Sequence, residues 1–268
     1  MKVTFDTNVF QLVVEPDRCI GQTCHASCVA INAALSSGRI SGYFSEAMIS
    51  VDALTRKDKV DVVASSRIIC KSSAQSTRPL SVSISIGRHS ERREISAEFL
   101  VSFQKALDLG MRALIGPRLL GYSLAIRGFD DECYEPIAAE KFAVCAGLTN
   151  TVDSELLSRG VGRARAIELG CEDIDDGEWW PQGLERAITN GKLKKVREVI
   201  NEWVDGEAIA AHVGYGNDFF CTHDKARKAG QNSVFHKTHC NWLTERYGVK
   251  FVTLQDLADY LQSVIGTQ

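Results

Sequence analysis

The sequence has no long hydrophobic run, and this absence is the first restriction on its class. A membrane-spanning helix needs about 18 consecutive apolar residues, and no stretch of the 268-residue chain approaches that length. The first ten residues, MKVTFDTNVF, also lack the basic start and apolar centre of a signal peptide. These absences predict a cytoplasmic protein with no membrane association.

No CxxC pair occurs among the nine cysteines, so the commonest zinc and dithiol motifs are missing. In a reducing cytosol we expect most of these cysteines to be small buried side chains. The densest group is CIGQTCHASC at 19–28, and a zinc site there would need a second ligand pair, such as one from HKTHC at 236–240. The sequence therefore favours buried thiols over zinc.

An excess of positive charge is also missing, since the formal net charge is −3, so the composition does not mark a nucleic-acid-binding protein. The charges are distributed unevenly, however. Basic residues outnumber acidic ones between 55 and 130, and the reverse holds between 131 and 204. Two ordinary solvated surfaces, or a basic lobe that attracts phosphate groups, would both explain this pattern.

Apolar patterns typical of strands and helices alternate at both ends of the chain. They predict strands that end near Asp6, at 40–45, at 218–222 and at 249–253, with helices at 23–38 and after residue 253. Strands that alternate with helices are typical of a parallel sheet, so we expect an α/β protein.

The central part of the chain has fewer clear signals. Strict alternation predicts a strand at 80–86, and an apolar stripe predicts a helix at 96–110 with Phe99, Leu100, Phe103 and Leu107 facing inward. Residues 111–115 are a further candidate strand. We expect helices at 134–170 and 192–204, a surface loop at 172–183, and a separate short helix that begins at Asp205.

Acidic residues occur where several of these strands end. Asp6, Glu46 and Asp224 each follow an expected strand, and the carboxyl ends of parallel strands share one edge of a sheet. Asp205, at the start of the preceding helix, would point to the same edge. Four converging acids would repel one another unless a cation lies between them, and carboxylate ligands favour Mg²⁺ or Mn²⁺. Such ions activate water and hold phosphate oxygens.

This ordered set of acids resembles the PIN domain, a family of metal-dependent ribonucleases. FDTN at 5–8 is similar to the family's first strand with its Asp, and FSEAM at 44–48 is similar to the segment with its second acid. The C-terminal block resembles the family most closely, with Asp205, an alanine-rich helix, and a strand ending in Thr222-His-Asp224. The tail YGVKFVTLQDLADYL resembles the family's last strand and helix. Glu46 and Asp205 lie farther apart than in typical members.

The resemblance implies a three-layer α/β/α fold around a central parallel sheet, formed by residues 1–55 and 200–268. Residues 56–199 would then be a large inserted mixed α/β lobe that selects substrate or forms a dimer surface. The implied activity is endoribonucleolytic hydrolysis of RNA phosphodiester bonds with Mg²⁺ or Mn²⁺, leaving 5′-phosphate and 3′-hydroxyl ends.

The resemblance also implies roles for individual residues. Asp6, Glu46, Asp205 and Asp224 would be the catalytic metal ligands, oriented by Asn8 and Thr222. The RNA backbone would contact Lys225, Arg227 and Lys228, although a solvated turn explains these three cations equally well.

Each acid also has an ordinary structural alternative. Asp6 would cap the helix that follows it, and Glu46 would be stabilised in a first helical turn by the helix dipole. Asp205 would simply start a helix or turn, with Glu207 as the rival third acid. Asp218 lies at the opposite end of its strand from Asp224 and is expected to be structural.

Other functions remain as alternatives. A non-catalytic PIN-like module would bind RNA or a protein, and a toxin ribonuclease would have an antitoxin partner; a homo-oligomer is compatible with each. A haloacid-dehalogenase-type phosphatase would need an Asp where the chain has Asn8. A dinucleotide-binding fold would need a glycine-rich first turn, which DTNVF lacks.

Overall fold

The computed structural model describes residues 1–52, 66–73, 81–88, 96–117, 131–175, 178–223 and 230–265. It is an α/β protein, as the sequence predicted, and its main sheet has five parallel strands in the order β5-β2-β1-β6-β7. These strands are β1 (Lys2–Phe5), β2 (Ser41–Ser45), β5 (Arg112–Leu114), β6 (Phe219–Cys221) and β7 (Phe251–Val252). No helix in the described part of the chain is both long and apolar enough to cross a membrane.

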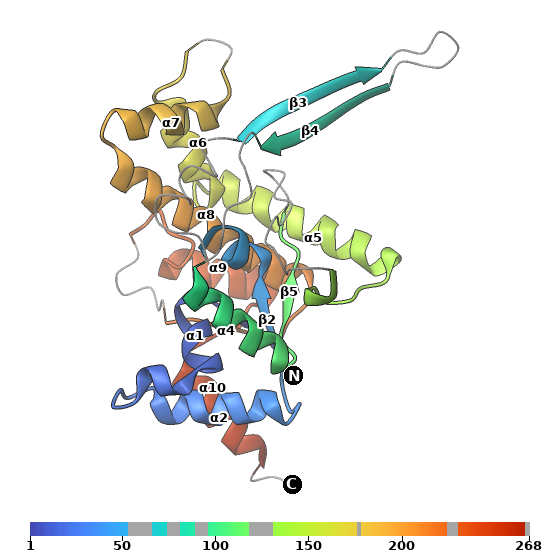
Figure 1. The fold of residues 1–268 in the computed structure, drawn as a ribbon, viewed down its shortest axis with the longest axis vertical. Helices are drawn as coiled ribbons and strands as arrows, with labels where there is room; N and C mark the ends of the chain where they lie inside the picture. Colours follow the sequence, from blue (N-terminus) through green and yellow to red (C-terminus); the bar gives the residue numbers. More distant parts are fainter. Residues whose placement is uncertain are drawn as a thin grey trace.

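Helices pack on both faces of this sheet (Figure 1). One face is covered by α1 (Thr7–Val14), α2 (His25–Ser36), α4 (Ala97–Asp108) and α10 (Leu254–Ile265), and the short helix η1 (Pro16–Cys19) follows α1. The other face is covered by α5 (Ala139–Ser158), α8 (Leu193–Gly214) and α9 (Lys237–Tyr247). The remaining short helices are η2 (Met48–Asp52), η3 (Asp131–Cys133), α6 (Arg163–Cys171) and α7 (Trp180–Thr189).

The strand order explains why helices occupy both faces. The chain adds β2 and then β5 on one side of β1, and then β6 and β7 on the other side. Right-handed crossovers made in opposite directions place their helices on opposite faces of a sheet. The strand side chains alternate accordingly: Val3 and Phe5 pack with α1 and α2, whereas Thr4 between them contacts α8.

The helix expected at 96–110 is confirmed as α4. The Ser96 hydroxyl oxygen accepts a hydrogen bond from the Phe99 amide at 3.2 Å, and Gly110 has the positive φ of 78° that ends the helix. Phe99 and Phe103 are buried as predicted. The prediction that Leu100 faces inward is wrong, because 47% of its surface is exposed. Ser102 and Ala106 take the inward positions instead, because α4 packs on a narrow stripe against α1.

A second sheet consists of the antiparallel strands β3 (Ser66–Ser73) and β4 (Ser81–Arg88). It confirms the strand that alternation predicted at 80–86. Figure 1 shows this pair extending away from the main sheet.

The sequence placed a helix boundary at Asp205, and this prediction is wrong. The helix α8 runs without interruption from Leu193 to Gly214 and has 22 residues. A Cβ atom at Gly206 would lie only 3.1 Å from the Cα atom of Gly162, so this glycine allows the start of α6 to approach α8 closely. The expected loop at 172–183 is also too long, because α7 begins at Trp180.

Part of the segment expected as an inserted lobe belongs to the main sheet. Residues 96–117 contribute α4 and β5, and Phe103 and Ala113 are buried in the same cluster as Phe5 and Phe44. The helices α6, α7 and α8 form a separate apolar cluster, in which Trp180 lies edge-on to Trp203.

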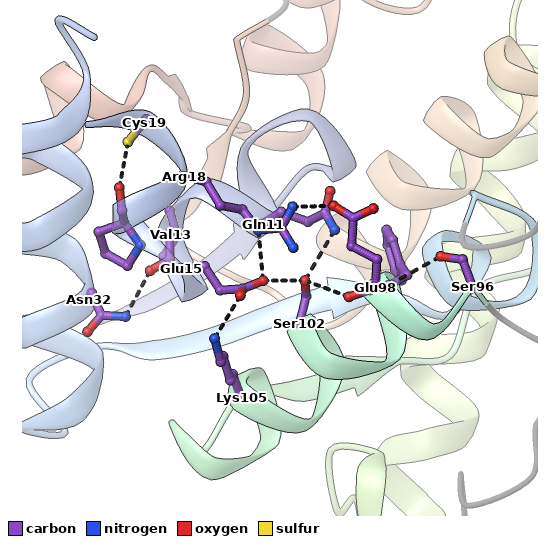
Figure 2. Close-up of polar contacts among 12 residues, drawn as sticks. Gln11, Val13, Glu15, Arg18, Cys19, Asn32, Ser96, Glu98, Ser102 and Lys105 are labelled. Carbon is purple, nitrogen blue, oxygen red and sulfur yellow. Dashed lines mark hydrogen bonds and ion pairs between the residues drawn. The ribbon is translucent and has the colours of Figure 1, made fainter. Parts of the chain in front are cut away.

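Polar contacts fasten α4 to α1 and η1 (Figure 2). The Glu15 carboxylate accepts hydrogen bonds from Ser102 at 2.6 Å, Lys105 at 2.7 Å and Arg18 at 2.9 Å, and Arg18 also pairs with Glu98 at 2.6 Å. Burial opposes the charge of Glu15, but the hydrogen bonds from Lys105, Ser102 and Arg18 outweigh it and lower the pKa of Glu15. This network holds the helix that follows Asp6.

Candidate active site

The strand order places a switch point between β1 and β6. From β1 the chain builds the sheet outward in one direction through β2 and β5, and in the other through β6 and β7. In open parallel sheets, ligand sites lie outside the carboxyl ends of the strands at such a point. The residues immediately after β1 and β6 are Asp6 and Thr222, so the candidate site begins with these two side chains.

Asp6 is buried at this edge, with 6% of its surface exposed. Its Oδ1 atom accepts a hydrogen bond from the Thr7 amide at 2.8 Å, and its Oδ2 atom accepts one from the Thr222 hydroxyl at 2.6 Å. Asp6 is therefore the N-cap of α1, as the structural alternative predicted. This cap does not exclude a metal ligand, because two carboxylate oxygens have about four lone-pair sites.

Asn8 and Thr222 connect the first turn of α1 to the end of β6. The Asn8 amide nitrogen donates to the Thr222 hydroxyl oxygen at 3.2 Å, and the Asn8 carbonyl oxygen accepts from the His223 backbone amide at 3.1 Å. Thr222 thus accepts a hydrogen bond from Asn8 and donates one to Asp6. This chain fixes the orientation of the Asp6 carboxylate, while the His223 side chain is exposed.

Glu46 directly follows β2, the neighbour of β1, and has 5% of its surface exposed. The Tyr134 hydroxyl donates to its Oε1 atom at 3.2 Å. Tyr134 lies beside β5 through a bridge to Ala113. Tyr134 could not be predicted from the sequence, because no local pattern links it to an acid 88 positions away.

Asp205 lies on the face of α8 directed toward β1. His212, seven residues later, contacts the Thr4 hydroxyl of β1 through its ring nitrogen Nδ1 at 2.9 Å. Seven residues are nearly two full helical turns, so Asp205 shares this face and lies about 10 Å nearer the carboxyl edge of the sheet. Asp205 is half-buried. Although it does not start a helix, its place on α8 brings it toward the same edge as Asp6.

Glu207, the rival third acid, lies on a different face of α8. Four residues later, Ala211 packs against Tyr43 of β2, so Glu207 is directed toward β2 and β5 rather than β1. Burial raises the pKa of Glu207 well above its usual value, and the charges of Asp153 and Glu46 add to the effect. Its Oε1 atom is buried and has no hydrogen-bond partner among the described residues.

The Asp153 carboxylate beside Glu207 is paired with the Arg163 guanidinium at 2.6 Å. Burial nevertheless raises the pKa of Asp153, against the lowering effect of Arg163. Both residues line a cavity of about 470 Å³ that reaches Gly116 at the end of β5. This pair could not be predicted from the sequence, because neither residue lies in a recognisable motif.

The described acids do not form a group of three closely spaced metal ligands. Within the described ranges, three ligand atoms within 4.8 Å of one another occur only in the group Cys19, Cys24 and Cys28, so the acids do not converge that tightly. Mg²⁺ is usually held by only one or two carboxylates together with several waters, so a site for it does not need three converging acids. Four further predicted residues, Asp224, Lys225, Arg227 and Lys228, lie outside the described residues.

Asp218 lies at the other end of β6. Its Oδ2 atom accepts a hydrogen bond from the Lys2 backbone amide at 2.7 Å, which joins the starts of β6 and β1. This contact is the structural role that the sequence favoured.

Comparison with known proteins identifies no relative: no protein-family model matches the chain, and no curated protein matches its sequence. The function proposed for the chain therefore depends on the geometry of the site.

Proposed function

We propose that this protein is a metal-dependent endoribonuclease with a PIN-like three-layer fold. It would hydrolyse RNA phosphodiester bonds with Mg²⁺ or Mn²⁺ and leave 5′-phosphate and 3′-hydroxyl ends. The observation that carries the proposal is the burial of Asp6 and Glu46 at the carboxyl ends of neighbouring parallel strands, beside the switch point of the sheet.

The residues of this edge have distinct roles in the proposed reaction. Asp6 binds the cation directly, and Glu46, Asp205 and Asp224 complete the site, in part through water. A cation held by these residues would supply an activated water molecule and neutralise charge on the phosphate. Thr222 holds the Asp6 carboxylate in one orientation through their 2.6 Å hydrogen bond.

The RNA backbone would lie over the segment that follows β6. Lys225, Arg227 and Lys228 come within six residues of Thr222, and cations at such a position contact phosphate oxygens without reading sequence. These contacts would position the substrate near the four acids.

The test compares the wild type with Asp6→Asn on labelled single-stranded RNA, with Mn²⁺ or with EDTA. Asparagine is as good an N-cap as aspartate, so Asp6→Asn keeps the start of α1 and removes the charge. Asp218→Asn is the matched control, because it changes the acid at the opposite end of β6. We expect Mn²⁺-dependent cleavage by the wild type and by Asp218→Asn, and a loss of about 100-fold or more in Asp6→Asn.

Cleavage that survives in Asp6→Asn, or in EDTA, would refute the carboxylate site. RNA binding without cleavage by the wild type would instead indicate the non-catalytic PIN-like module. Circular dichroism of each variant establishes that the fold is retained.

A further inference from the structure

Three cysteines of the segment 19–28 come together beside the exposed turn between η1 and α2. Cys19 ends η1, whereas Cys24 is the N-cap of α2 and Cys28 lies four residues further along it. Residues four apart on a helix share a face, and the Cys28 amide donates to the Cys24 carbonyl at 2.9 Å. The three Sγ atoms all lie within 4.8 Å of one another.

This spacing is close to that of a metal site. Zn–S bonds are about 2.3 Å long, so thiolates around one tetrahedral ion lie about 3.8 Å apart. The three sulfur atoms would need to approach one another by at most about 1 Å to reach that geometry. Their present hydrogen bonds are weak ones, from Cys19 to the Pro16 carbonyl at 3.1 Å and from Cys24 to the Gln22 side chain at 3.8 Å (Figure 2 shows the first).

The three cysteines differ in their exposure to solvent. Cys19 and Cys28 are fully buried, and Cys24 is half-buried. Burial raises the pKa of Cys19 and of Cys28, so both are thiols until a cation replaces their protons. Cys24 supplies the entry path, and the solvent on its side supplies a fourth ligand.

We propose that Cys19, Cys24 and Cys28 form a binding site for a thiolate-seeking cation, with Zn²⁺ as the ion that fits best. Soft sulfur ligands select Zn²⁺ over Mg²⁺, so this site is chemically separate from the carboxylate edge. The second ligand pair that the sequence suggested at 236–240 is not part of it, because α9 packs on the opposite face of the sheet.

The site has a structural consequence for the rest of the molecule. A cation bound to all three sulfurs would fasten η1 to the start of α2, across a turn in which Ile20 is 67% exposed. Cys221 of β6 lies on the inner side: burial raises its pKa, and the charges of Asp6 and Cys28 add to that effect. The three cysteines therefore lie close to β6, the strand that ends at the candidate active site.

The test uses the full chain, purified with a reductant and stripped with a chelator, and then titrated with Co²⁺ as a spectroscopic substitute for Zn²⁺. We expect a thiolate-to-cobalt charge-transfer band that saturates at one Co²⁺ per chain, and loss of this band when Zn²⁺ displaces the ion. Cys24→Ser removes the half-buried ligand and should weaken binding at least about 10-fold, since outer-shell partners alone are worth 10–100-fold.

Two controls separate this site from other sources of metal binding. Cys171→Ser changes an exposed cysteine on α6 outside the cluster, and it should leave the band and the affinity unchanged. Asp6→Asn should also keep the band, because it alters only the carboxylate edge.

A second measurement needs no variant. Zn²⁺ should protect Cys24 of the wild type from alkylation, as read by peptide mass spectrometry, and should leave Cys171 reactive. The proposal is overturned by a titration without the charge-transfer band, by unchanged affinity in Cys24→Ser, by equal alkylation of Cys24 with and without Zn²⁺, or by a disulfide within the cluster in the reduced preparation.

Discussion

His212 provides the sharpest test of how α8 is packed against the sheet. Its side chain is 1% exposed, its ring lies edge-on to Phe220 with centroids 5.4 Å apart, and its Nδ1 atom is 2.9 Å from the Thr4 hydroxyl oxygen. Asn217 also donates to that oxygen at 2.8 Å, which leaves the Thr4 proton available to Nδ1 of a neutral imidazole. Burial lowers the pKa of His212 to about 3, against a small opposing effect of Asp218.

The magnitude follows from proton linkage. An unfolded histidine has a pKa of about 6.5, so below that pH the unfolded chain binds a proton that the folded chain rejects until about pH 3. Stability therefore falls as the pH decreases through this window. Between pH 7 and pH 4.5 this lowers the free energy of unfolding by about 2–3 kcal/mol.

The perturbation that isolates this effect is His212→Asn. The asparagine oxygen takes the place of Nδ1 as the acceptor for Thr4, whereas the lost ring contact lowers stability equally at every pH. Urea unfolding between pH 4.5 and pH 7 gives the free energy of unfolding for both proteins. We expect the free energy of unfolding of the wild type to fall by about 2–3 kcal/mol more than that of the variant over this range.

The other titratable groups are common to both proteins, so their effects cancel in the difference. Six histidines are present, and the NMR signal missing from the variant identifies His212. Parallel pH curves for the two proteins, or a His212 signal that titrates near pH 6.5, would refute the buried neutral imidazole.

Three further substitutions test other contacts. Because burial raises the pKa of Glu207, wild-type stability should carry a component that falls as the pH rises above about 4.3. Glu207→Gln should lack this component in urea unfolding between pH 5 and pH 7. A Cβ atom at Gly183 would overlap the backbone carbonyl oxygen of Gly170, so Gly183→Ala should cost about 1–3 kcal/mol or more, seen as a lower Tm. Glu15→Gln weakens the contact with Lys105 and should lower the free energy of unfolding by about 1 kcal/mol at pH 7. Because the pKa of Glu15 is lowered, this difference between the two proteins should disappear as the pH falls below about 4.

Each of these substitutions has its own contradicting result. Gly147→Ala, on α5 with open space around it, should raise stability by up to about 1 kcal/mol, and equal tolerance of Gly183→Ala would refute the close contact of α6 and α7. An undiminished pH slope in Glu207→Gln would show that Glu207 is ionised in the folded chain. A Glu15→Gln penalty that is equal at pH 3 and pH 7 would show that the charge of Glu15 contributes nothing.

Local patterns were sufficient for most of the elements. The strands at β1, β2, β4 and β6 and the helix α4 were predicted correctly, because alternation, an amphipathic stripe, a serine cap and a closing glycine are contained within a few neighbouring residues. The same local signals place Asp6 and Glu46 directly after their strands. The parallel sheet follows from the alternation of strands with helices.

Errors arose where a distant contact overrides the local signal. Asp205-Gly206 is typical of a helix boundary, but the approach of Gly162 to Gly206 needs a glycine inside a continuous helix. Leu100 fits the apolar stripe of α4, yet it is exposed because α1 covers only the neighbouring positions.

By itself, then, the sequence determined the positions of β1, β2, β4, β6 and α4 and which acids follow strands, since both depend on neighbours in the chain. Only the tertiary structure decided which distant groups meet. It joined Thr222 to Asp6 across 216 positions and Tyr134 to Glu46 across 88. These meetings depend on the order of strands and on the faces that helices cover, and no short segment of sequence encodes either.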